Sequence, residues 1–284
     1  MVEYCEYTHT TRDGLSLYYR VYGRNKIDQT PVLCLSGLTR NSRDFNRLAA
    51  HIGHTRPVFC LDYRGCGRSS RDLDYMNYQV DTDAADVADL LDGINVPEAI
   101  FMGTSRGGLT TMTLAMSRID LIAAAIMNDV GPALRAGGRG KVGKYFELPY
   151  AYPNWDTACL AFREWSEKTT PGLNDAQWME RASATFVETQ DGRVCFDFDP
   201  KMAQAYRERI NPPHSWVKFE ALMVKPILSI RGEWSGILTA ETVDEMRVRN
   251  PDMHAVTVPN RGHTPLLDEP AALAAIDLFL EALP

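Results

Sequence analysis

The chain has 284 residues, with 37 acidic against 30 basic side chains and a formal net charge of −7. This length suits one large domain, or a core with an insertion, that can bury a sizeable hydrophobic interior. The acidic balance argues against nucleic acid and anionic membranes as partners, and no apolar run approaches the roughly 20 residues that a membrane helix needs.

The N-terminal residues and the cysteines bear on where the protein resides. Residues 1–6 contain neither the basic nor the apolar region of a signal peptide. The six cysteines show no C-x-x-C spacing, and without an export signal we interpret all of them as reduced thiols. We therefore expect a cytoplasmic protein.

Short apolar runs along the chain predict a sheet. An alternating stretch at 15–22 predicts an antiparallel strand. Continuous apolar runs follow, which is typical of strands buried on both faces of a parallel sheet. These runs are 31–35, 57–61, 100–102, 122–127, 226–230 and 255–258. Because helix-like segments separate them, at 42–54, at 81–94 and after Ser105, we expect a doubly wound sheet with its reactive loops at the carboxyl ends of the strands.

This rhythm of strand and helix stops between Pro132 and Pro213. Glycine and proline clusters, aromatic residues and helix-like stretches at 157–165 and 175–188 occupy this segment. Loops without structure of their own rarely reach such a length. We therefore expect a mostly helical cap at 132–213, inserted in a core formed by 1–131 and 214–284. Five aromatic residues could line a pocket beneath the cap, although we expect most to form its own small core: Tyr145, Trp155, Trp165, Trp178 and Trp216.

A glycine-flanked serine lies at the end of the apolar run at 100–102. The sequence Gly103-Thr104-Ser105-Arg106-Gly107 is a G-x-S-x-G pattern between a predicted strand and a predicted helix. A tight turn there strains the backbone and exposes the serine hydroxyl at a helix N-terminus, where N–H groups favour negative charge. Ser105 is therefore the candidate nucleophile. The simpler alternative is a glycine-rich turn with an incidental serine.

A serine alcohol needs a base within hydrogen-bond reach. Among the six histidines, His263 lies in a loop directly after the last predicted strand and before the final helix. This position is at the carboxyl edge of the sheet, on the same side as Ser105. The order of serine before histidine in this topology favours His263 as the base.

Two backbone N–H groups must also stabilise the oxyanion that forms on the substrate. One is expected from Arg106, which directly follows the nucleophile. The other is expected from Leu38, because Ser36-Gly37 after the strand at 31–35 lets the backbone approach closely. Taken alone, that loop is explained almost as well by a simple glycine turn.

These motifs together resemble the α/β-hydrolase family over nearly the whole chain. Ser36-Gly37 occupies the place of the family's His-Gly oxyanion turn, and 62–69 is similar to its D-x-R-G-x-G-x-S loop. Gly103 to Gly107 corresponds to the nucleophile elbow, and Gly262-His263 to the histidine loop. The resemblance implies an α/β fold with a doubly wound, mostly parallel eight-stranded sheet and a helical cap inserted after the sixth strand.

The acid that would orient His263 has two candidates. The family usually places an Asp after the strand at 226–230, but that loop reads Arg-Gly-Glu-Trp-Ser-Gly from Arg231, with serine and glycine where the carboxylate would fall. Glu233 comes earlier in the loop. Asp129 follows the strand at 122–127, and some family members take their acid from that position. An aspartate there can also serve only to cap a loop, yet we favour Asp129 over Glu233.

The sequence therefore predicts a cofactor-free serine hydrolase, an esterase or lactonase that cleaves a small or medium carboxylic ester or lactone. Two alternatives remain: an inactive ligand-binding protein of the same fold, and a carbon–carbon bond hydrolase or lyase that uses the same Ser-His pair. We find no metal cluster, phosphate loop or dinucleotide fingerprint in the sequence. We expect a small-molecule substrate, and the sequence leaves a homo-oligomer open.

Overall fold

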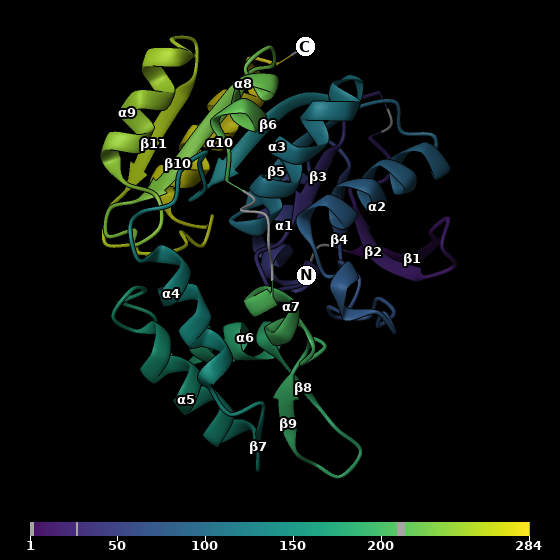
Figure 1. Cartoon of the computed structure of the whole chain (residues 1–284), viewed down its shortest axis with the longest axis vertical. Coiled ribbons are helices and arrows are strands. Elements are labelled where there is room, and N and C mark those ends of the chain that lie inside the picture. The colour runs from purple at the N-terminus through teal and green to yellow at the C-terminus, as the bar shows by residue number, and fades with distance from the viewer. Residues whose placement is uncertain (1–2, 27, 209–213, 284) are drawn as a thin grey trace.

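The computed structural model describes residues 3–26, 28–208 and 214–283. Within them, eight strands form one sheet in the order β1-β2-β4-β3-β5-β6-β10-β11 (Figure 1). The strands are β1 (Tyr4–Thr10), β2 (Ser16–Tyr22), β3 (Val32–Leu35), β4 (Val58–Leu61), β5 (Ala99–Thr104), β6 (Ile122–Asn128), β10 (Ile227–Gly232) and β11 (His254–Val258). Strands β1 and β2 pair antiparallel with their neighbours, and every other pairing is parallel. The expected mostly parallel sheet is confirmed.

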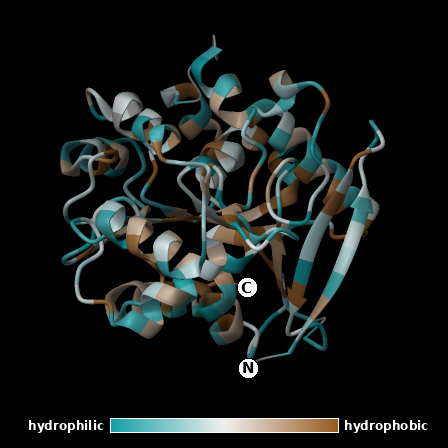
Figure 2. Ribbon diagram, turned by 90° about the horizontal axis from the view of Figure 1, so that it is seen from below, coloured by the Kyte–Doolittle hydropathy of each residue, from teal (hydrophilic) through white to brown (hydrophobic). Residues whose placement is uncertain are grey.

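Helices cover both faces of this sheet. One face packs against α1 (Asn46–Ile52) and α10 (Pro270–Glu281), and the other against α2 (Val80–Gly93), α3 (Arg106–Arg118), α8 (Trp216–Leu222) and α9 (Ala240–Arg249). Side chains of one strand alternate between the two cores: Leu33 and Leu35 join one, and Val32 and Cys34 join the other. The central strands are accordingly mostly hydrophobic, whereas the outer helices carry both hydrophilic and hydrophobic residues (Figure 2). Burial on both faces explains why these strands have continuous apolar sequences.

Strand register brings the loops of the site together at one edge. Thr104 pairs with Asn128 between β5 and β6, and Asn128 pairs with Ile230 between β6 and β10. The residues that follow, Ser105 and Asp129, therefore leave the sheet side by side. Their amides continue the pairing, since Ser105 N donates to Asn128 O over 3.0 Å and Asp129 N donates to Ile230 O over 2.7 Å.

The segment between β6 and α8 packs at the carboxyl edge of the sheet, in the lower half of Figure 1. Its described elements are α4 (Gly138–Gly143), η4 (Lys144–Glu147), β7 (Ala151–Tyr152), α5 (Trp155–Ser166), α6 (Asp175–Thr185), β8 (Phe186–Glu188), β9 (Val194–Phe196) and α7 (Met202–Glu208). The segment thus contains helices, as expected, and also a small sheet in the order β7-β9-β8. The boundary expected at residue 213 lies outside the described residues.

Two predictions about individual elements were wrong or incomplete. The helix expected at 175–188 ends at Thr185, because Phe186 begins β8 and its ring packs against Phe196 of β9 at 4.7 Å between centroids. Strand β1 was not predicted from its residues, since most of its side chains are exposed and show no apolar alternation. In the described part of the chain, no helix is long and apolar enough to cross a membrane.

Candidate active site

Ser105 occupies the turn between β5 and α3 with φ +51° and ψ −108°. A non-glycine residue with positive φ costs about 1–3 kcal/mol, and such conformations persist where the surroundings fix them. Gly103 and Gly107 must be glycines, because the neighbouring backbone leaves no room for a Cβ at either position. A Cβ on Gly107 would lie 2.0 Å from Leu35 O in β3, and one on Gly103 would lie 2.5 Å from Gly108 N in α3.

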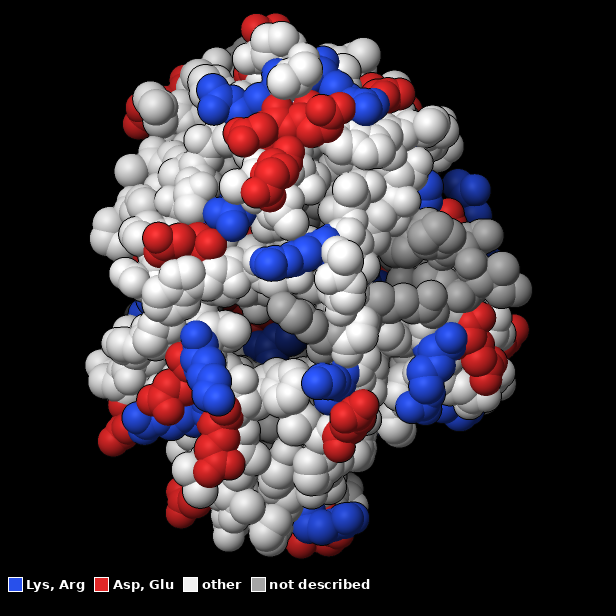
Figure 3. All heavy atoms as spheres, turned by 60° about the vertical axis from the view of Figure 1, so that its left-hand side comes forward, with Lys and Arg blue, Asp and Glu red and all other residues white. Residues whose placement is uncertain are grey.

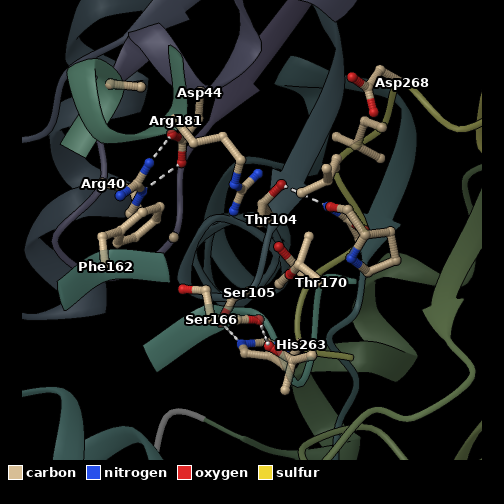
Figure 4. Close-up of a pocket in the computed structure, with 18 of the residues that line it drawn as sticks. Arg40, Asp44, Thr104, Ser105, Phe162, Ser166, Thr170, Arg181, His263 and Asp268 are labelled. Atoms are coloured by element: carbon tan, nitrogen blue, oxygen red, sulfur yellow. Dashed lines mark hydrogen bonds and ion pairs between the residues drawn. The ribbon is translucent and has the colours of Figure 1, made fainter. Parts of the chain in front are cut away.

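The imidazole of His263 lies next to the serine. Ser105 Oγ is 2.9 Å from His263 Nε2, and His263 Nδ1 is 2.7 Å from Asp129 Oδ2. A carboxylate at Nδ1 favours the tautomer that carries its proton there, which leaves Nε2 free to accept the serine proton. Three residues from widely separated parts of the chain thus form one hydrogen-bonded series (Figure 4 labels Ser105 and His263).

Asp129 is fully buried, and each of its carboxylate oxygens has a partner. Oδ1 accepts from Gly232 N over 2.9 Å, and Oδ2 accepts from Ser235 Oγ over 2.7 Å as well as from His263. These donors compensate the cost of burying a charge. The backbone of Asp129 also has positive φ, at +53°.

Ser235 is the member of this network that the sequence analysis did not assign. Its hydroxyl accepts from Ile237 N and Leu238 N, which directs the hydroxyl proton to Asp129. The sequence contained a signal, since this serine stands in the loop where the family's acid was expected. A hydroxyl there donates to a carboxylate that comes from β6.

Glu233, the alternative acid, lies away from the imidazole. Its side chain is exposed, and Oε2 accepts from Asn260 N over 2.9 Å. The carboxylate therefore ties the loop after β10 to the loop after β11. The structure brings Asp129, and not Glu233, to His263.

Leu38 and Arg106, the residues expected to supply the oxyanion N–H donors, come from two different segments near Ser105. Leu38 lines the same pocket as Ser105, and a Cβ on Gly37 would lie 3.8 Å from the Cβ of Ser105. Arg106 begins α3, and its guanidinium turns into the core, where Nε pairs with Asp83 over 2.6 Å. Burial acts to lower the pKa of Arg106, but the Asp83 carboxylate outweighs it, and the pKa is raised.

A cavity of about 470 Å³ opens above Ser105 and His263. Loops at the sheet edge line one wall, and α5 and α6 line the other. Tyr145 and Trp165 lie in this lining, whereas Trp178 is buried in the core of the segment. In a space-filling view the molecule is hollowed between its upper and lower parts, with basic side-chain atoms in the depth of the hollow (Figure 3). The volume falls in the range of small-molecule sites.

Sequence comparison decides the family. Residues 32–276 match the alpha/beta hydrolase family, a range that contains Ser105, Asp129 and His263. The chain belongs to this family. Homologues named as hydrolases and esterases support hydrolase activity for this alpha/beta hydrolase.

Three similar proteins illustrate the relationship. An alpha/beta hydrolase from Novosphingobium aromaticivorans has a crystal structure with a TM-score of 0.92 and 38% identity, covering 99% of both chains. The 3-hydroxybutyrate-oligomer hydrolase of Cupriavidus necator is 32% identical over 259 residues, 87% of each chain. Esterase YbfF of Escherichia coli is 24% identical over 266 residues, 90% of this chain and 95% of its own.

Proposed function

We propose that this alpha/beta hydrolase is a serine hydrolase that cleaves a small or medium carboxylic ester or lactone through an acyl-enzyme on Ser105. The observation that carries the proposal is the continuous series from Ser105 Oγ through the imidazole of His263 to Asp129, with distances of 2.9 and 2.7 Å. A base at hydrogen-bond distance from a partly exposed alcohol, with the base oriented by a buried acid, is the arrangement that nucleophilic acyl transfer needs.

In the first half of the proposed reaction, Ser105 Oγ forms a bond to the substrate carbonyl carbon while His263 Nε2 takes the hydroxyl proton. The negative charge moves to the carbonyl oxygen, where the amides of Leu38 and Arg106 donate hydrogen bonds. The N-terminal end of α3 adds a favourable dipole. Asp129 stabilises the imidazolium. Collapse of this intermediate breaks the bond to the leaving alcohol, which receives the proton from His263.

In the second half, a water molecule attacks the acyl-enzyme with His263 as base, and the same donors stabilise the second oxyanion. The bond to Ser105 then breaks, Ser105 Oγ recovers its proton from His263, and the carboxylic acid departs. We further propose that 132–213 acts as a cap over this chemistry. Its support is that α5 and α6 line the cavity and that Gly262 N, beside His263, donates to Thr169 O over 2.7 Å.

The reason to consider an inactive binding protein was that the loop after β10 lacks the Asp that the family usually has there. The hydrogen bond from His263 to Asp129 supports the enzyme over this alternative. Cleavage of a carbon–carbon bond would use the same Ser-His pair, so a diketone belongs in the substrate screen beside 4-nitrophenyl esters of several chain lengths and lactones.

Fluorophosphonate labelling tests the proposal. The parent protein is expected to take up one probe per chain, because the probe reacts with a serine activated by a base, and Ser105→Ala is expected to take up none. Ser166→Ala is the matched control, since Ser166 lines the same cavity, and it should be labelled like the parent. A parent protein that resists labelling, or a labelled Ser105→Ala variant, would overturn the assignment.

A further inference from the structure

The cavity above Ser105 contains four arginines, three of which already have carboxylate partners. Arg40 pairs with Asp44, Arg43 pairs with Asp197 over 2.6 Å, and Arg47 pairs with both Glu180 and Asp268. The pairs of Arg43 and Arg47 join segments that are distant in the chain, whereas the Arg40 pair lies within residues 40–44. The acids that line the cavity are therefore already occupied by these three cations.

Arg181 of α6 differs from the other three. Among the residues that the structure describes, its guanidinium has neither a hydrogen bond nor an ion pair, and its Nε is buried without a partner. The contact it makes is with the ring of Phe162, whose centroid lies 5.8 Å from Cζ; the Arg40 guanidinium lies 5.9 Å from the same ring. Figure 4 shows the side chain extending into the pocket that also holds Ser105 and His263.

An unpaired guanidinium in this position is electrostatically unfavourable. Burial, together with the nearby cation of Arg40, lowers the pKa of Arg181 to about 10. The group therefore stays protonated at neutral pH, and the fold bears a partly buried charge that makes no direct ion pair among the described residues. An anion that enters the cavity would supply the missing partner.

We propose that Arg181 binds the carboxylate of an acidic ester, so that the substrate carries a free carboxylate besides the ester that Ser105 attacks. This inference rests on the proposed function. A guanidinium presents N–H donors in a planar fork that matches a carboxylate. The Phe162 ring against the guanidinium restricts its orientation. Because Arg181, Ser105 and His263 line one cavity of about 470 Å³, one small molecule can reach all three.

Paired substrates test the inference by kinetics. Mono-4-nitrophenyl glutarate and 4-nitrophenyl pentanoate differ by a carboxylate on the acyl side, and 4-acetoxybenzoate and phenyl acetate differ by one on the alcohol side. In at least one pair the parent should prefer the acidic ester, and Arg181→Gln should lower kcat/KM for that ester by about 100-fold, mainly through KM. The neutral ester should change by less than about threefold. Arg181→Lys, which keeps the charge without the fork, should lie between.

Arg43→Gln is the matched control, because Arg43 lines the same cavity but is paired with Asp197, a carboxylate that does not line it. It removes the same charge and should retain the preference for the acidic ester. An Arg181→Gln variant that loses activity equally on both members of each pair would assign Arg181 a structural role and overturn the inference. A parent without preference in either pair would do the same.

A binding measurement separates this inference from the proposed serine chemistry. In the Ser105→Ala background, which needs no turnover, glutarate is expected to raise the melting temperature, since a ligand that binds the folded state stabilises it. Ser105→Ala/Arg181→Gln should show no such shift. Fluorophosphonate labelling without a glutarate effect would reject the carboxylate site and leave the serine hydrolase standing; the reverse pattern would reject the serine chemistry alone.

Discussion

The two walls of the pocket differ in how a charged side chain is paired. On the sheet side, both oxygens of Asp129 are matched by donors from Gly232, Ser235 and His263. On the side formed by α5 and α6, Arg181 lies in the same cavity with no polar partner among the described residues. The Asp129 carboxylate is fully paired without a ligand, and the Arg181 guanidinium is not.

The difference separates two tasks of an active site. A fully satisfied network has one favourable arrangement, which suits groups that must hold an imidazole in a fixed position before substrate arrives. An unsatisfied cation lowers stability and keeps its binding capacity for a ligand. This distribution of partners agrees with the proposal that the sheet side performs the chemistry and that Arg181 recognises the substrate.

The largest effect on kcat is expected when the negative charge of Asp129 is removed. Asp129→Asn should lower kcat by about 10³- to 10⁴-fold, because an amide at that position no longer stabilises the imidazolium and favours the wrong tautomer. Glu233→Gln is the matched control and should stay within about twofold of the parent, since Glu233 contacts the amide of Asn260 instead. Steady-state hydrolysis of a 4-nitrophenyl ester measures both.

If Glu233→Gln were the more damaging change, the acid of this site would not be Asp129. A circular dichroism spectrum and a melting curve of Asp129→Asn are needed beside the kinetics. Asp129 also anchors Gly232 at the end of β10, so a folded variant is required before the loss is assigned to chemistry.

The sequence predicted the elements of the sheet side far better than those of the opposite wall. Continuous apolar strands and the elbow at Ser105 depend on local patterns, which a single chain displays directly. The preference for Asp129 over Glu233 needed the order of strands in the sheet, and it came from a family resemblance rather than from spacing. The partner of Asp129, Ser235, depends on contacts between residues 106 positions apart, which no local pattern encodes.

The opposite wall was predicted only as a helical insertion. Its small sheet joins β7 and β8 to β9 through pairs of two or three residues, too short to show alternation. Nothing in the sequence distinguishes Arg181, because an arginine on a helix is usually solvated. Its unusual state follows from packing of α5, α6 and the sheet loops around one cavity, and becomes visible only in three dimensions.

Unfolding by urea should distinguish a paired, buried arginine from an unpaired, partly buried one. Arg64, 2% exposed, pairs with Asp86 and Asp72 over 2.6 Å and with Asp13 over 2.9 Å. Arg64→Met should lower the free energy of unfolding by about 3–5 kcal/mol, because it leaves buried carboxylates without a partner. Arg181→Met should stay within about 1 kcal/mol of the parent or exceed it.

If Arg181→Met lowered the free energy of unfolding as much as Arg64→Met, the contrast between a paired and an unpaired arginine would be contradicted. Such a result would mean that Arg181 is compensated within the folded protein, and the reason for assigning it a ligand would disappear. Adding glutarate to both samples sharpens the comparison, since only a protein that retains Arg181 should gain stability from it.

The smallest effect concerns the hydroxyl that supports Asp129. Ser235→Ala removes a charge-assisted hydrogen bond, and kcat should fall by about 10-fold with little change in KM, because the carboxylate loses one of the groups that position it. Ser229 on β10 provides a control of the same kind. It is 0% exposed, and its Oγ has no hydrogen-bond partner among the described residues, so Ser229→Ala should leave kcat unchanged. Equal losses in both variants would mean that any buried serine near β10 matters for packing, whereas a loss confined to Ser235→Ala traces the effect to its contact with Asp129.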